Sequence, residues 1–102
     1  MLELRPTCEN CNAALPPDSE AAMICSFECT FCVACVRDVL LNVCPTCGGG
    51  FVSRPVRPRR NWRGGNHCGE YPPTERVRHR PIDAAAHRTF AVAIADIVPS
   101  RR

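Results

Sequence analysis

The chain of 102 residues contains no lysine, so all thirteen of its basic side chains are arginine. With abundant alanine, proline and glycine, this bias is typical of a GC-rich bacterial coding sequence. The sequence also lacks an apolar run long enough to cross a bilayer. Its first residues, Met-Leu-Glu-Leu-Arg-Pro-Thr-Cys, lack the basic and apolar regions of a secretory signal. We therefore expect a cytoplasmic protein with reduced thiols.

Cysteine is the residue that the sequence has in excess. Eight of the nine cysteines fall within forty residues, in four close pairs: Cys8/Cys11, Cys25/Cys29, Cys32/Cys35 and Cys44/Cys47. Eight thiolates in four pairs are the ligand set of two tetrahedral zinc sites. A module of about fifty residues buries too little apolar surface to be stable without a metal or disulfides. Because disulfides need an oxidising compartment, the sequence favours two Zn2+ ions per chain.

Charge is divided unequally along the chain. Residues 1–50 carry two arginines and six carboxylates, a net charge of −4, whereas residues 51–102 carry eleven arginines and four carboxylates, a net charge of +7. Two Zn2+ ions on eight thiolates would add about four further negative charges to the first half. We therefore expect an acidic head and a basic tail.

Composition divides the chain into three segments. Residues 1–52 form the cysteine-rich zinc module. Residues 53–81 are rich in proline, glycine and arginine and predict a disordered linker. Residues 82–98 have apolar side chains at three- and four-residue steps, which predicts an amphipathic helix. Asp83 is positioned to cap this helix, and Pro99 marks its end.

The module itself predicts a small metal-stabilised α+β fold with short strands and one helix, followed by a flexible basic arm and the C-terminal helix. The alternating stretch Cys25–Cys29 suits a short strand. After the third pair, apolar residues at helical spacing predict a two-turn helix. These residues are Val36, Val39, Leu40 and Val43. We expect the helix to pack on Ile24, Phe27 and Phe31, with Phe51 and Val52 closing the core.

The spacing of the cysteines has a geometric reason. Two cysteines separated by two residues wrap a tight knuckle around one ion, and backbone N–H groups in the knuckle point at the sulfurs. In the last pair, Pro45 fixes one turn dihedral, and Gly48 permits the positive φ by which the chain leaves the knuckle. Each ion needs two pairs, so two arrangements remain open. In a sequential arrangement Cys8 shares an ion with Cys25, and in a crossed one it shares an ion with Cys32.

The order and gaps of the eight cysteines, the Cys44-Pro45-x-Cys47 ending and the helix after the third pair resemble a RING finger in an all-cysteine version. The resemblance implies a RING-like or treble-clef fold with crossed pairing. One ion would be held by Cys8, Cys11, Cys32 and Cys35, and the other by Cys25, Cys29, Cys44 and Cys47. Ubiquitin-ligase RINGs carry an apolar residue in the first knuckle and often an aromatic residue on the helix. Here these regions offer Glu9 and Val39, so ligase activity is not expected.

Several stretches besides the cysteines resemble a family of short bacterial proteins, the domain of unknown function 1272. They are Met1-Leu2-Glu3-Leu4-Arg5-Pro6, Leu15-Pro16-Pro17-Asp18-Ser19, Ile24-Cys25-Ser26-Phe27-Glu28-Cys29-Thr30-Phe31-Cys32 and Cys44-Pro45-x-Cys47-Gly48-Gly49. This resemblance covers roughly residues 1–60 and implies no activity.

The expected function follows from the completeness of the metal sites. Eight cysteines fill two closed sites, which leaves no open position for catalysis, so we expect no enzyme. The leading hypothesis is structural zinc that supports a scaffold surface for a protein partner. The alternative is an auxiliary nucleic-acid binder, because an arginine cluster flanks Trp62. This cluster consists of Arg54, Arg57, Arg59, Arg60 and Arg63.

The ninth cysteine, Cys68, lies outside the pairs. Beside His67, and with His79 and His87 downstream, it raises the alternative of a third metal site. That spacing contains no knuckle, and the surrounding glycines and prolines are typical of an irregular segment. The sequence therefore favours a free thiol at Cys68 and solvated histidines.

Overall fold

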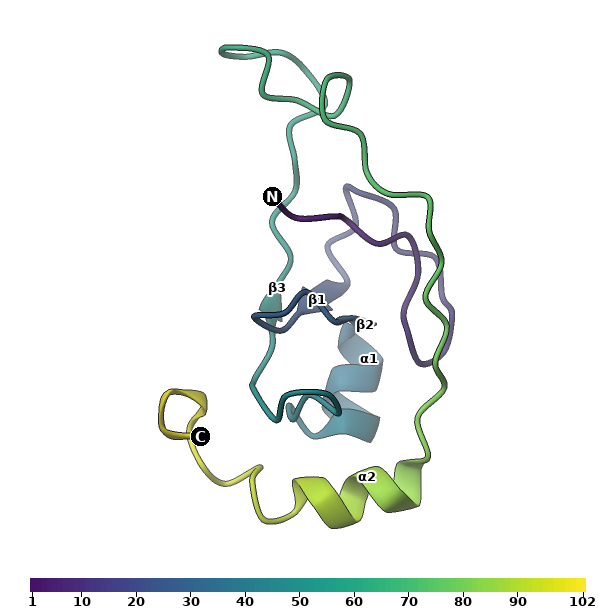
Figure 1. Cartoon of the computed structure of the whole chain (residues 1–102), viewed down its shortest axis with the longest axis vertical. Coiled ribbons are helices and arrows are strands. Elements are labelled where there is room, and N and C mark those ends of the chain that lie inside the picture. Colours follow the sequence, from purple (N-terminus) through teal and green to yellow (C-terminus); the bar gives the residue numbers. More distant parts are fainter.

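The computed structural model describes all residues, 1–102. A three-stranded antiparallel sheet in the order β2-β1-β3 lies within residues 22–53 (Figure 1). Its strands are β1 (Ala22–Ile24), β2 (Thr30–Cys32) and β3 (Val52–Ser53). The helical elements are α1 (Val33–Cys35), the wider turn η1 (Val36–Leu40), α2 (Ala84–Ala91) and the single turn η2 (Pro99–Arg101). The expected small α+β module is thus confirmed.

The stretch Cys25–Cys29, which was expected to be a strand, is the turn that joins β1 to β2. Within it the Cys25 N–H donates to the Cys29 carbonyl at 3.2 Å, and Glu28 has a φ of 67°. The strands lie on either side of this stretch, with Met23 opposite Phe31. The alternating pattern therefore predicted extended structure in the correct region, but the residues that alternate form the hairpin turn and not a strand. A tight turn brings Cys25 and Cys29 close together, which an extended strand would not do.

The helix predicted after the third cysteine pair is confirmed, and it begins at Val33, before the pair is complete. It runs through α1 and η1 and ends at Leu41 and Asn42, whose φ angles of 55° and 56° are left-handed. Val36 and Leu40, two of the predicted apolar positions, are buried on its inner face. A continuous ribbon from β2 therefore carries the third cysteine pair into the core.

The core contains few large side chains. Phe31 and Phe51 meet edge to face with ring centroids 5.5 Å apart. Phe27 and Val52, which were also expected inside, are 69% and 66% exposed, because they lie in the hairpin turn and on the outer strand. Five of the eleven residues in the buried cluster are cysteines. So small an apolar core contributes little stability of its own, and cysteine sulfurs form a large part of it.

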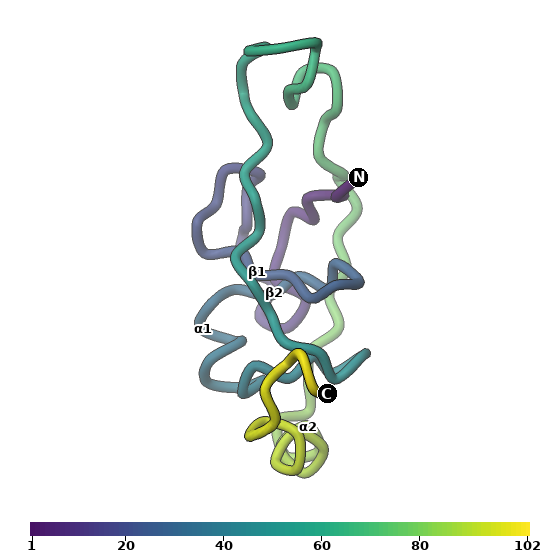
Figure 2. Tube along the Cα trace, turned by 90° about the vertical axis from the view of Figure 1, so that its left-hand side faces the viewer, coloured from purple at the N-terminus to yellow at the C-terminus, as the bar shows by residue number.

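Residues 53–81 were expected to form a disordered linker. They contain no helix, and their only strand residue is Ser53, as their composition suggests. The segment nevertheless leaves the module, turns in a loop and returns along it (Figures 1 and 2). The amides of Thr74 and Arg80 donate to the carbonyls of Glu3 and Glu9, at 2.8 and 2.7 Å. The returning strap, residues 74–82, thus satisfies backbone groups of the N-terminus that have no strand partner.

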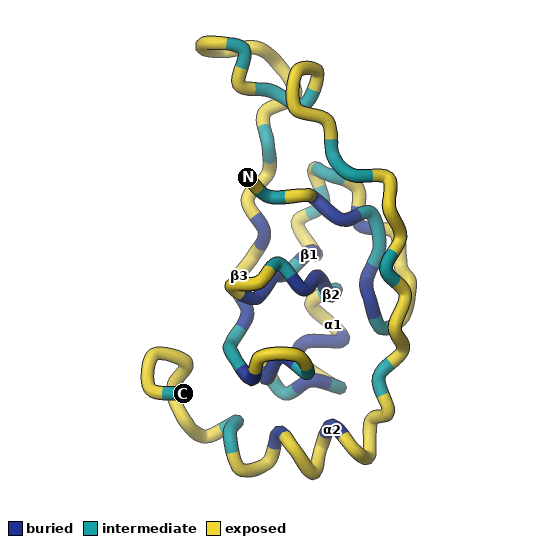
Figure 3. Tube along the Cα trace, in the orientation of Figure 1, coloured by how far each residue is buried: buried dark blue, intermediate teal, exposed yellow.

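The C-terminal helix α2 is shorter than the predicted 82–98. Asp83 caps it as expected, because its carboxylate accepts from the amides of Ala85 and Ala86, both at 3.1 Å. His87 and Ala91 form its buried stripe (Figure 3), and α2 packs on η1. After a run of turns, Pro99 opens η2 instead of ending a long helix.

The last residue also contacts the module. The Arg102 guanidinium donates to the carbonyls of Asn42 and Gly48, at 2.7 and 3.2 Å. The C-terminal segment therefore lies against the end of η1 and the fourth cysteine pair. Neither α2 nor any other helix has the length and apolar character needed to span a membrane.

Candidate metal centres

The first candidate metal centre brings together the first and third cysteine pairs. The four sulfurs all lie within 4.8 Å of one another. They belong to Cys8, Cys11, Cys32 and Cys35. The loop before β1 supplies the first two, the end of β2 supplies the third and α1 supplies the fourth. Four sulfurs from segments this far apart in sequence converge because the β2–α1 junction lies against the first knuckle.

The second centre brings together sulfurs of the second and fourth pairs. Those of Cys25, Cys44 and Cys47 lie within 4.8 Å of one another. Cys29 falls outside this triplet, but it is buried and its carbonyl accepts from the Cys25 amide at 3.2 Å. Cys29 is therefore the cysteine placed to complete the second set.

The grouping distinguishes the two arrangements that the spacing left open. Cys8 lies with Cys32 and not with Cys25, and Cys25 lies with Cys44 and Cys47. This is the crossed arrangement that the RING resemblance implied.

Hydrogen bonds to the sulfurs orient them. The amides of Phe27 and Gly49 donate to Cys25 Sγ and Cys47 Sγ, each at 3.3 Å. The knuckle around Cys47 needs the φ of 74° at Gly48, as the sequence indicated. Donors of this kind stabilise negative charge on sulfur and so favour thiolates that bind a metal.

Burial is the main influence on the pKa of four of the thiols. Burial raises the pKa of Cys25, Cys32, Cys35 and Cys44. Cys11 is the exception, since a backbone hydrogen bond at Ala13 lowers its pKa. A bound cation reverses the effect of burial, because it stabilises the thiolate directly.

The spacing of sulfurs in the first donor set fits a single ion. Sulfurs on a tetrahedron with metal–sulfur bonds of about 2.3 Å stand about 3.8 Å apart, and Cys11 Sγ and Cys32 Sγ are 3.8 Å apart. Four thiolates around one point are typical of zinc or of a mononuclear iron site. Both cysteine groups could therefore hold a metal ion.

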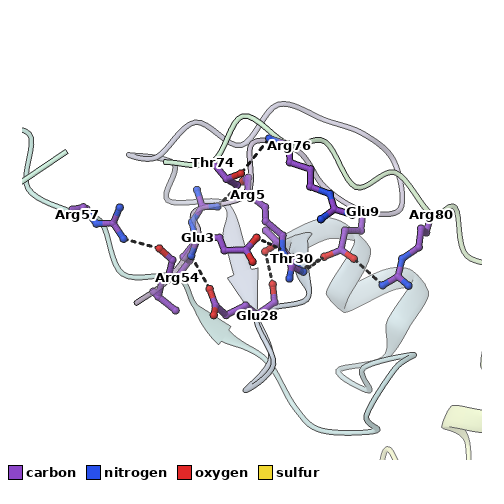
Figure 4. Close-up of polar contacts among 11 residues, drawn as sticks. Glu3, Arg5, Glu9, Glu28, Thr30, Arg54, Arg57, Thr74, Arg76 and Arg80 are labelled. Atoms are coloured by element: carbon purple, nitrogen blue, oxygen red, sulfur yellow. Dashed lines mark hydrogen bonds and ion pairs between the residues drawn. The ribbon is translucent and has the colours of Figure 1, made fainter. Parts of the chain in front are cut away.

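A buried carboxylate next to the first centre was not predicted. Glu9 is 1% exposed and accepts from the Arg5 guanidinium at 3.0 Å, from Arg80 at 3.3 Å and from the Thr30 amide (Figure 4). Three donors satisfy this carboxylate, so it connects the first knuckle to β2 and to the strap. Arg5, four residues before Glu9, was the only local hint of this network.

The ninth cysteine and the histidines do not converge. Cys68 Sγ lies 3.6 Å from the Arg57 carbonyl. The ring nitrogens Nε2 of His79 and His87 lie 3.1 and 2.9 Å from the carbonyls of Asn10 and Leu40. Each group has a separate contact, and the two cysteine groups contain none of them.

The predicted arginine cluster is split into two parts. Arg54 is 4% exposed and donates to the carbonyls of Arg5, Leu15 and Pro16 at 2.8, 3.2 and 2.8 Å. Burial lowers its pKa. Arg57 donates to the carbonyls of Leu2 and Tyr71, at 2.6 and 2.7 Å. The side chains of Arg54 and Arg57 therefore form hydrogen bonds within the protein. The other three arginines of the cluster are exposed: Arg59, Arg60 and Arg63.

Comparison with known proteins places the cysteine module in a family. An uncharacterised protein of Rhizobium meliloti (strain 1021) is 62% identical over 58 residues, which cover 57% of this chain and 69% of that protein. No solved structure matches the chain. A family described as "Protein of unknown function (DUF1272)" matches residues 1–57, which include both cysteine groups and Arg54. More than half of the chain is matched, and the protein belongs to this family.

Proposed function

We propose that this protein binds two structural zinc ions, one in each cysteine group, and that they hold in place a RING-like scaffold surface for a protein partner. The observation that carries the proposal is the convergence of Cys8, Cys11, Cys32 and Cys35 within 4.8 Å. A structural zinc site contributes about 10–16 kcal/mol apparent in finger peptides. Since a whole domain is stable by only about 5–15 kcal/mol, two such ions would dominate the stability of this small core.

Ligand count supports a structural role over a catalytic one. A catalytic zinc has three protein ligands and an open position, whereas four cysteines fill the tetrahedron. The first group has four sulfurs, and Cys29 lies next to the triplet of the second. The proposal therefore includes no enzymatic activity. It also includes a cytoplasmic location, because zinc binding requires reduced thiols.

An apolar groove supports the scaffold part of the proposal. It has a volume of about 430 Å³ and lies between the sheet and the end of η1. Its lining is Met23, Val33, Val36, Arg37, Leu41, Asn42 and Phe51. Val33 is 45% exposed at this groove, directly after the ligand Cys32. The groove would take one large apolar side chain of a partner, and its walls are held by the segments that converge on the ions.

Metal content tests the first part of the proposal. Native mass spectrometry with elemental analysis should find two zinc ions in the wild-type chain. Cys47→Ser, which alters an exposed member of the second group, should retain one, and Cys68→Ser should retain two. One ion or none in the wild type, iron in place of zinc, or loss of metal on Cys68→Ser would overturn the two-site proposal.

The scaffold surface is tested separately. A photo-crosslinking amino acid at Val33 should yield one discrete protein adduct in bacterial cells, and the same partner, once purified, should bind the zinc-loaded chain. Val33→Asp should abolish that binding. Val56→Asp is a matched control, because Val56 is 50% exposed and does not line the groove. Equal losses in both variants, or no binding by the purified partner, would contradict a docking role for the groove.

A further inference from the structure

A loop lies at the end of the molecule opposite α2 (Figures 1 and 2), and it carries three exposed arginines. We define the arginine loop as residues 57–69, and we propose that it binds single-stranded nucleic acid. Its exposed arginines contact backbone phosphates, and Trp62 stacks against one base. This function is independent of the partner of the zinc module.

The arginine loop is closed and ordered by its own hydrogen bonds. At its base the Cys68 amide donates to the Pro58 carbonyl at 2.8 Å. At its tip the Gly65 amide donates to Asn61 Oδ1 at 2.9 Å, and the Asn66 side chain donates to the Arg63 carbonyl at 3.1 Å. Arg57 fastens the base by donating to Tyr71. A preformed loop loses less conformational entropy on binding than a disordered arm would.

The charge of the loop is of one sign. Residues 57–69 contain four arginines and no carboxylate. Arg57 is used at the base, which leaves three side chains for a ligand. The nearest carboxylate contact is Asp18, 3.9 Å from Arg59, with 64% and 88% of these side chains exposed. So exposed a pair is weak and competes poorly with a phosphate chain.

Trp62 supplies the second element of the site. It is 75% exposed, and the Arg60 guanidinium carbon lies 6.0 Å from its ring centroid. Base–aromatic stacking tolerates any sequence, because every base has a π face. The loop neighbours of Trp62 are Asn61 and Arg63, so this ring is not part of an apolar patch of the kind that inserts into a membrane.

The shape of the loop favours a single strand over a duplex. Reading a major groove takes a helix or a two-stranded ribbon, and the loop contains neither. A base can stack on Trp62 only when it is unstacked from its neighbours, as bases in single strands can be. Phosphates on either side of that base would then face Arg59, Arg60 or Arg63.

The test uses the zinc-loaded full chain and a fluorescein-labelled oligothymidylate of about 12 nucleotides, within the usual site sizes. Anisotropy should show binding with a salt slope of about −2, because each phosphate contact on a single strand contributes about −0.7. Replacing the three exposed arginines of the loop by glutamine should remove most of this slope. The matched control replaces Arg76, Arg88 and Arg101, which are also exposed, and should retain it.

The stacking contact has its own test. Trp62→Ala should weaken binding about tenfold, Trp62→Phe should restore much of the loss, and Tyr71→Ala is the aromatic control at the base of the loop. If the two triple-arginine variants lost affinity equally, binding would depend on net charge alone, and the proposal would be overturned. Absence of binding at low salt would overturn it as well. So would loop-dependent binding to phosphatidylserine vesicles without binding to the oligonucleotide, since it would identify an anionic membrane as the ligand.

Discussion

The Asn10 side-chain amide donates to Cys35 Sγ across 3.3 Å. The oxygen of the same side chain accepts from the Ile82 amide at 2.9 Å, and the Asn10 carbonyl lies 3.1 Å from His79 Nε2. One residue in the first knuckle therefore touches both a candidate metal ligand and the strap. Coupling of this kind is reciprocal, so metal binding and docking of the strap should stabilise each other.

We expect Asn10→Ala to weaken both metal binding and docking of the strap. Removing a group that hydrogen-bonds a metal ligand typically lowers metal affinity by about 10–100-fold. Competition with a chromogenic chelator should show weaker binding of one of the two ions, and hydrogen exchange should be faster around Ile82. Asn66→Ala, which removes an amide from the arginine loop, is the control. Unchanged zinc affinity in Asn10→Ala would show that this hydrogen bond does not support the site.

Features encoded by neighbouring residues were predictable. The spacing of Val36 and Leu40 predicted the helix after the third pair, and Asp83 predicted the start of α2. The spacing of the cysteines predicted two groups, but their crossed pairing came from a family resemblance and not from geometry. The two centres lie in one small core, and the spacing alone allows Cys8 to join either.

Features that depend on distant partners were not predictable. Arg54 reads as one more cation of a basic arm, yet its carbonyl partners lie 38 to 49 residues away. Glu9 is buried because Arg80, 71 residues later, returns to it along the strap. The strand expected at Cys25–Cys29 failed for a related reason. Alternation describes which side a residue faces, but the left-handed φ of Glu28 turns the chain there.

The Glu9 network makes a prediction about stability. Glu9→Gln leaves the Arg5 guanidinium, whose side chain is 8% exposed, with only the 42% exposed carboxylate of Glu3, at 3.3 Å, as its counter-ion. Breaking a buried ion pair from one side lowers the free energy of unfolding by about 3–5 kcal/mol. Unfolding of the zinc-loaded chain in guanidinium chloride measures this change in the free energy of unfolding. Asp38→Asn removes the partner of Arg37 in an exposed pair and should change little. Equal effects of the two changes would argue against the network.

Arg54 should matter for folding and not for nucleic-acid binding. Arg54→Ala leaves the buried carbonyls of Arg5 and Leu15 without this donor and should lower the free energy of unfolding by at least about 2 kcal/mol. Arg54→Lys should recover only part, because an ammonium cannot match the planar fork of guanidinium. Arg88→Ala, on the exposed side of α2, is the control and should be close to neutral. If the folded Arg54→Lys variant bound the oligonucleotide more weakly, Arg54 would be part of the nucleic-acid-binding surface, contrary to this prediction.

The cap of α2 allows the helix to be loosened without touching the cysteines. Asp83→Ala removes the acceptor of the Ala85 and Ala86 amides, which should destabilise α2 by about 1 kcal/mol. Because His87 and Ala91 still pack on η1, we expect faster hydrogen exchange in Ala84–Ala91 with both zinc ions retained. Asp96→Ala changes an exposed carboxylate beyond α2 and should leave exchange in the helix unchanged. Loss of zinc from Asp83→Ala would mean that the module needs α2 to hold its ions. Metal binding would then depend on residues well outside the family-matched segment 1–57.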